Sequence, residues 1–137
     1  MINWLGNLRM NRAADWLGQA EDDLAAAEDS AATGHHEWVA FQAQQCAEKA
    51  AKALVHSLHG GVRGHAITDI LQQLPAAVIV APDLLDAARE LDKVYVTSRY
   101  PNGFVSGRPK DYFSQKTSQE LIRYARTILE FCRSQIY

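Results

Sequence analysis

Apolar residues recur every three or four positions along most of the chain, which is the spacing of one face of an α-helix. The first stripe consists of Met10, Ala13, Leu17, Ala20, Leu24, Ala27 and Ala31. The second stripe consists of Val39, Ala43, Cys46, Ala47, Ala50, Leu54 and Leu58. Glycine tolerates the positive φ at which helices often end, so Gly34 and the Gly60-Gly61 pair are the expected C-terminal stops.

Three more helices are predicted in the second half of the chain. A short one covers residues 67–74 before Pro75, and another begins after Pro82 with Asp83 as its expected N-cap. The last helix spans roughly residues 114–135 and carries its own apolar stripe. Alternating strand patterns of any length are absent from the sequence. It therefore predicts an all-α fold, an antiparallel up-and-down bundle of four longer helices plus one short helix.

A chain of 137 residues suits a single domain. Within it we expect residues 1–10 to form an N-terminal extension and residues 99–113 to form a loop of functional interest. The longest apolar run, residues 76–81, is far shorter than the ~20 residues of a membrane-spanning helix, and the N-terminus lacks a signal-peptide pattern. We therefore expect a cytoplasmic protein without a membrane partner. Cys46 and Cys132 lack metal-ligand spacing and are expected to be small buried hydrophobes.

Charge changes this picture only locally. Lys and Arg number 14 against 16 acidic residues, so the chain as a whole has no positive field that would attract nucleic acid. The exception is the irregular segment around residues 99–110, which combines Pro and Gly with the cations Arg99, Arg108 and Lys110. Loops on rigid scaffolds often carry function. The alternative is that this segment simply connects two antiparallel helices.

The second helix also carries a polar stripe, formed by Gln42, Gln45, Lys49, Lys52, His56 and His59. A solvated face with a Glu48–Lys52 pair explains it, since such a pair contributes only ~0.3 to 0.5 kcal/mol. If the stripe instead faces the loop, Lys49, Lys52 and Arg99 would converge on an anion such as a phosphate. The spacing alone favours the solvated face.

Short motifs follow one another in a particular order along nearly the whole chain. They are Gln44-Gln45-x-x-Glu48-Lys49-x-x-Lys52, Gly64-His65, Leu91-Asp92-x-x-Tyr95 and Arg99-Tyr100-Pro101, after a helix that contains Ala13-Ala14-Asp15. In this order and spacing they resemble the HEPN domain, a small all-helical module found beside or fused to nucleotidyltransferases in bacteria and archaea. The resemblance implies a helical bundle that forms a homodimer, with its functional surface near the dimer cleft.

The resemblance also bears on activity. Many HEPN domains are ribonucleases with an Arg followed four to six residues later by a His. Here no His follows Arg99, because the five histidines are His35, His36, His56, His59 and His65. The Arg63–His65 pair has the wrong spacing. Arg99-Tyr100-Pro101-Asn102 instead resembles the Arg-Tyr-Pro-Asp version of the domain, with Asn in place of Asp, which is associated with nucleotidyltransferase partners.

Three hypotheses follow. The first is a non-catalytic or accessory HEPN protein without a cofactor, which binds a nucleotide or nucleic-acid phosphate and acts with a separately encoded nucleotidyltransferase. Its expected ligand-binding residues are Lys49, Lys52, Arg99, Tyr100, Asn102, Arg108 and Lys110. The second is a metal-free endoribonuclease toxin of a toxin-antitoxin pair, in which Arg99 holds the phosphate and His65 or His56 is the base. The third is an oligomerisation module that grips a partner with Trp4, Leu5 and Leu8.

Each candidate also has a plain structural interpretation. Arg99 follows Tyr95 by one helical turn and precedes a proline, so it is equally suited to cap the carbonyls at the end of that helix. Tyr95 and Tyr100 fit packing better than base stacking, and His65 fits a structural hydrogen bond. Adjacent histidines such as His35 and His36 do not face each other on a helix, so no metal site is expected.

Overall fold

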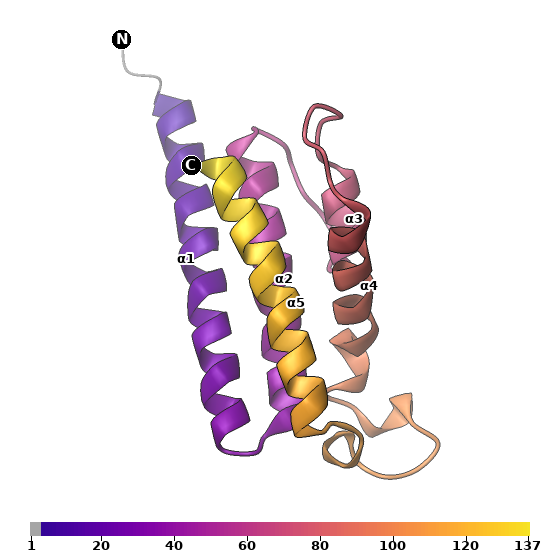
Figure 1. The fold of residues 1–137 in the computed structure, drawn as a ribbon. Coiled ribbons are helices and arrows are strands. Elements are labelled where there is room, and N and C mark those ends of the chain that lie inside the picture. The colour runs from indigo at the N-terminus through magenta and orange to yellow at the C-terminus, as the bar shows by residue number, and fades with distance from the viewer. Residues whose placement is uncertain (1–3) are drawn as a thin grey trace.

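The computed structural model describes residues 4–137, with side chains from Arg12 onward. Its α-helices are α1 (Trp4–Ala32), α2 (His36–Ser57), α3 (Ile67–Gln72), α4 (Pro82–Thr97) and α5 (Gln115–Ile136), and two 3-10 turns, η1 (Pro101–Gly103) and η2 (Pro109–Tyr112), lie between α4 and α5. The described residues contain no strand. The all-α prediction is confirmed, with four longer helices and one short one (Figure 1).

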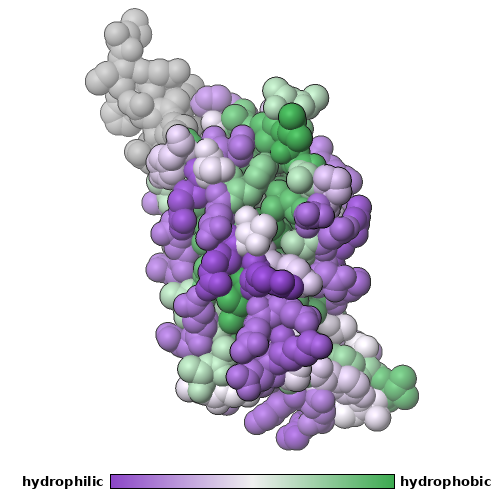
Figure 2. All heavy atoms as spheres, in the orientation of Figure 1, coloured by the Kyte–Doolittle hydropathy of each residue, from purple (hydrophilic) through white to green (hydrophobic). Residues whose placement is uncertain are grey.

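Helix α2 lies at the centre of the bundle, and α1, α4, α5 and the short α3 all pack against it. Half of its buried positions are alanines, which let neighbouring helices approach closely, and the largest fully buried apolar side chain in it is Leu54. Figure 1 shows the loop between α4 and α5 at the end of the bundle opposite the C-terminus. Hydrophilic side chains cover most of α1 and α5 on the face seen in Figure 2, as amphipathic helices around one core require.

Several helix boundaries differ from the prediction. Helix α1 begins at Trp4 and not near Met10, so its backbone includes most of the expected extension; the side chains of Trp4, Leu5 and Leu8 lie outside the described residues. Helix α2 ends at Ser57, which leaves Leu58 40% exposed instead of in the apolar stripe. The positive φ that follows, 63°, belongs to His59 and not to the Gly60-Gly61 pair.

Other boundaries are closer to expectation. Gly34 has the positive φ expected at the end of α1, 79°. Helix α3 stops at Gln72, two positions before the predicted end. The N-cap of α4 is Ala81 and not Asp83, because Pro82 occupies the first turn and places the Asp83 carboxylate inside the helix, where it interacts favourably with the positive end of the helix dipole.

The loop between α4 and α5 has more local structure than its sequence indicated. The Phe104 and Tyr112 rings stack with centroids 3.9 Å apart, and the Tyr112 hydroxyl donates to the Ser106 carbonyl. Asp111 accepts hydrogen bonds from the Arg108 backbone N–H at 2.9 Å and from its guanidinium at 3.1 Å. These contacts fold the loop onto itself and leave Val105 fully exposed. Among the described residues, no helix is both long and apolar enough to cross a membrane.

Candidate anion-binding site at the end of helix α4

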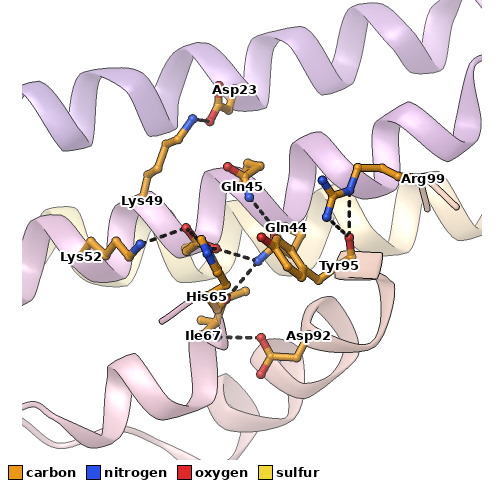
Figure 3. A network of polar contacts seen from close by, with 11 residues as sticks. Asp23, Gln44, Gln45, Lys49, Lys52, His65, Ile67, Asp92, Tyr95 and Arg99 are labelled. Atoms are coloured by element: carbon orange, nitrogen blue, oxygen red, sulfur yellow. Dashed lines mark hydrogen bonds and ion pairs between the residues drawn. The ribbon is translucent and has the colours of Figure 1, made fainter. Parts of the chain in front are cut away.

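Arg99 follows the last turn of α4, where Pro101 prevents the helix from continuing. Its Nε and one Nη donate to the Tyr95 carbonyl at 3.1 and 3.0 Å, so it caps the helix end as one interpretation of the sequence predicted. The guanidinium also lies 4.4 Å from the centroid of the Phe41 ring, 4.8 Å from that of Tyr95 and 5.1 Å from that of Tyr100. Three aromatic rings and a carbonyl therefore hold it in place. Figure 3 shows the hydrogen bonds from Arg99 to the Tyr95 carbonyl.

His65 is the second polar residue that contacts Tyr95, and its imidazole stacks on the Tyr95 ring with centroids 5.0 Å apart. His65 Nδ1 lies 3.2 Å from Glu48 Oε1, and the His65 side chain is 60% exposed while that of Glu48 is only 5% exposed. Glu48 also accepts from Lys52 Nζ at 3.1 Å and from Gln44 Nε2 at 3.2 Å. The buried carboxylate thus fixes one ring nitrogen of an exposed histidine.

Asp92 holds the segment after His65 in position from α4. The Asp92 carboxylate accepts from the backbone N–H of Ile67 at 2.7 Å, and from the backbone N–H and hydroxyl of Thr68 at 3.2 and 2.8 Å. The N–H groups of Ile67 and Thr68 lie in the first turn of α3 and therefore have no acceptor within the helix. Gln44 Nε2 donates in addition to the His65 carbonyl at 3.2 Å. The segment that carries His65 is therefore clamped between α2 and α4 (Figure 3).

We call Glu48, His65, Tyr95, Arg99 and Tyr100 the His65–Arg99 site. It combines residues from α2, from the segment before α3, from α4 and from the segment after α4. Tyr100 is 49% exposed, and Arg99 is half-buried. The site presents an oriented imidazole, a guanidinium held against aromatic rings, and an exposed phenol ring to solvent.

The two lysines of the polar stripe do not join Arg99. Lys49 Nζ pairs with Asp23 of α1 at 2.7 Å, and Lys52 Nζ pairs with Glu48 at 3.1 Å. In Figure 3 both lysines lie beyond Gln44 from Arg99. Each ammonium is thus matched by a carboxylate of its own, and the convergence on one anion that the stripe allowed is not observed.

The loop cations lie on the exposed surface rather than in the His65–Arg99 site. Arg108 is occupied by Asp111, whose pKa is lowered by the hydrogen bonds from the Arg108 backbone and guanidinium. Lys110 and Asn102 are exposed. Asn102 belongs to η1 and follows Arg99 by three positions in the sequence, after Tyr100 and Pro101.

The other histidines lie elsewhere. His56 stacks on Trp16 of α1 with centroids 5.8 Å apart, and its pKa is lowered by burial and by the charges of Arg12 and Lys52. It has no contact with Arg99 that would make the two a catalytic pair. His36 Nδ1 lies 2.6 Å from Ser118 Oγ, and the described part of the chain holds no cluster of His, Cys, Asp or Glu that could bind a metal ion.

Three residues that shape the site were missed as site residues. The sequence places Glu48 in a motif and in a solvated pair with Lys52, yet the structure shows it buried and in contact with His65. Asp92 is part of a motif in the sequence but is not among the predicted site residues. It lies about one helical turn from Tyr95, and this spacing indicates that the two side chains lie on the same face of the helix. Phe41 is an aromatic residue on a helix, and nothing in the sequence indicates that it contacts Arg99.

Fold and site together define a small all-helical domain with an arginine–aromatic site at the end of its fourth helix. The HEPN domain family matches residues 13–135 of this chain. The chain belongs to the HEPN domain family.

Solved structures agree with this assignment. TT1696 from Thermus thermophilus is 38% identical, with a TM-score of 0.90 over 91% of this chain and 98% of its own. ST0689, an archaeal HEPN homologue, is 39% identical, with a TM-score of 0.78 over 92% and 98% of the two chains. A candidate toxin of Methanocaldococcus jannaschii is 24% identical over 125 residues, 84% of this chain and 82% of that protein.

Proposed function

We propose that this protein is an accessory HEPN protein that binds a phosphate of a nucleotide or nucleic acid at Arg99 and acts with a separately encoded nucleotidyltransferase. The proposal rests mainly on one observation: the Arg99 guanidinium keeps hydrogen-bond donors that are available to a ligand. Two of its N–H groups donate to the Tyr95 carbonyl, which leaves about three of the five donors of an arginine for a ligand. None of the ion pairs among the described residues includes Arg99.

The surroundings of Arg99 favour an anion with a planar group attached. The aromatic rings hold the guanidinium in one orientation, so little side-chain freedom is lost when a ligand binds. Hydrogen bonds between a guanidinium and a phosphate are charge-assisted and contribute ~1.5 to 3 kcal/mol. The exposed Tyr100 ring lies beside it, and stacking of a base on such a ring contributes ~1 to 3 kcal/mol.

The partner and the assembly belong to the same proposal. The resemblance of Arg99-Tyr100-Pro101-Asn102 to the Arg-Tyr-Pro-Asp version of the domain supports a nucleotidyltransferase partner and a homodimer. A small nucleotidyltransferase from a neighbouring reading frame should co-purify with the tagged chain when both are expressed together. Light scattering should give twice the 15.2 kDa of one chain, and a mass of one chain would remove the homodimer from the proposal.

A second candidate function is a metal-free endoribonuclease toxin, which the Glu48–His65 pair favours. A buried carboxylate that fixes Nδ1 of a histidine leaves Nε2 available as a general base, as in catalytic triads. The candidate toxin among the relatives points the same way. Against it, His65 and Arg99 both contact the Tyr95 ring, and Figure 3 shows that ring between them. A base must lie within ~3.2 Å of the atom whose proton it removes. Because the Tyr95 ring separates His65 from a phosphate bound at Arg99, the accessory function fits the geometry better.

One gel experiment tests both candidates. Labelled single-stranded RNA is incubated with the protein in EDTA, and retention and cleavage are followed together for the wild type, Arg99→Ala and His65→Ala. Arg126→Ala is the matched control, because Arg126 is an exposed arginine on α5 that pairs with Glu28 of α1. Circular dichroism melting of each variant shows whether the fold is kept.

The accessory function predicts retention without cleavage, at least tenfold weaker in Arg99→Ala and unchanged in Arg126→Ala, which corresponds to a loss of ~1.4 kcal/mol or more. Equal retention by Arg99→Ala and wild type would contradict the site. Cleavage by the wild type that disappears in His65→Ala with the fold intact would replace the accessory function by the ribonuclease.

A further inference from the structure

A hollow lies between α2 and α1, away from the His65–Arg99 site. It has a volume of about 200 Å³ and is lined by Arg12, Asp15, Trp16, Gln19 and Lys49. Four of these residues come from α1 and one from α2. None belongs to the His65–Arg99 site, so this hollow needs an explanation of its own.

The aromatic wall of the hollow is held rigidly. Trp16 is half-buried against the core, its ring stacks on His56 at 5.8 Å with an interplanar angle of 23°, and Lys52 Nζ lies 5.6 Å from its centroid. Lys52 is itself fixed by its ion pair with Glu48. Groups from α2 therefore fix the orientation of the indole while part of it stays open to the hollow.

The charges around Trp16 favour an anionic group at one position. Lys49 and Lys52 are each matched by a carboxylate, Asp23 and Glu48. Arg12 is exposed at the rim of the hollow, and its charge contributes to lowering the pKa of His56, after burial. Among the described residues that line the hollow, Arg12 is consequently the cation that an incoming phosphate would meet.

The polar wall of the hollow, formed by Gln19 and Asp15, offers hydrogen-bond acceptors. Gln19 Nε2 donates to Asp23 Oδ1 at 3.0 Å, which leaves the amide oxygen of Gln19 as an acceptor. The carboxylate of Asp15 adds acceptors only. Two neighbouring acceptors suit a ligand that carries an amino group, as adenine, cytosine and guanine do on their Watson–Crick edges and uracil does not.

We propose that this hollow binds a nucleotide whose base carries an amino group (adenine, cytosine or guanine), with the base stacked against Trp16 and the phosphate next to Arg12. Pockets for whole drug-sized ligands measure ~300 to 1,000 Å³, so a hollow of about 200 Å³ accommodates one base and leaves the phosphate outside. The site is independent of the phosphate site at Arg99 and does not require the accessory function. A free nucleotide and a single-stranded nucleic acid both supply a base and a phosphate, so either could be the ligand.

Tryptophan fluorescence tests the proposal on the full chain. Trp4→Phe combined with Trp38→Phe leaves Trp16 as the single tryptophan of the three, so that quenching reports stacking at this site. The probes are AMP, UMP, ribose 5-phosphate and a short oligoadenylate. Arg12→Gln tests the phosphate contact, Arg126→Gln is the matched control, and Arg99→Ala separates this site from the other.

AMP is expected to quench Trp16 saturably, with binding about tenfold weaker for ribose 5-phosphate and several-fold weaker in Arg12→Gln, because stacking and a charged hydrogen bond are each worth ~1 to 3 kcal/mol. Arg126→Gln and Arg99→Ala should change nothing. Quenching by oligoadenylate without AMP would support the site and identify the strand as the source.

Other outcomes overturn the proposal. No quenching by either adenine probe, or equal quenching by ribose 5-phosphate, would exclude base stacking on Trp16. Equal affinity for UMP would exclude recognition through the two acceptors. Loss of quenching in Arg99→Ala would show that the two sites are one. If Arg99→Ala instead loses RNA retention but keeps the quenching of Trp16, the two sites are independent and both proposals are supported.

Discussion

Asp92 lies in the middle of α4, yet its carboxylate satisfies donors at the start of α3 and so determines where His65 lies. The sequence shows the motif around Asp92 but does not indicate this contact, because the contact joins residues about 25 positions apart in the chain. The same limit applies to Glu48 and Phe41. Arg99 was different: capping of a preceding carbonyl is a local interaction, and the spacing from Tyr95 predicted it.

Removing the Asp92 carboxylate is expected to destabilise the protein. In Asp92→Ala three hydrogen bonds at the N-terminus of α3 are lost, so the free energy of unfolding should fall by ~1 to 2 kcal/mol, the range of lost N-caps. Urea unfolding followed by circular dichroism measures the change. The control is Asp86→Ala, which removes an exposed carboxylate of α4 that pairs only with Arg89 and should stay within ~0.5 kcal/mol of wild type. Equal stability of the two variants would contradict the anchoring role.

At the scale of elements, the apolar stripes predicted the four long helices and most of the described positions that they bury; Leu58, at the end of the second stripe, is an exception. Helix ends were less predictable, since they depend on competing local interactions. Ser114 begins α5 as expected, because its hydroxyl accepts from the backbone N–H of Thr117. Asp83 was the wrong N-cap because Pro82 already starts the helix, and the 3-10 turns of the loop depend on side-chain contacts such as that of Phe104 with Tyr112.

The N-cap of α5 provides a test at this scale. Ser114→Ala removes the side-chain acceptor of the Thr117 N–H at 3.2 Å, so the free energy of unfolding should fall by ~1 kcal/mol. Ser134→Ala is the control, because the Ser134 hydroxyl bonds only to the Phe131 carbonyl in the last turns of the same helix. Urea unfolding of the two variants compares them directly. A loss from Ser134→Ala as large as that from Ser114→Ala would show that serine truncation on α5, rather than capping, is responsible.

At the scale of the whole molecule, the net charge of −2 agrees with binding sites that are local. The bundle places a guanidinium against aromatic rings at the end of α4 and an indole beside Arg12 on α1. The sequence predicted the bundle and singled out Arg99, but it could not show which polar groups neutralise one another. Lys49 and Lys52 were expected to bind the ligand, whereas the structure pairs them with Asp23 and Glu48.

The most direct test of the account is nuclear magnetic resonance mapping of the 15N-labelled chain during titration with inorganic phosphate and then with a short single-stranded RNA. The account predicts that the Nε–H resonance of Arg99 and the backbone amides of residues 95–100 and 102–104 shift with both ligands, because both place a phosphate at the guanidinium. Shifts confined to the exposed cations of α5, Lys116 and Arg123, with Arg99 unchanged would contradict it.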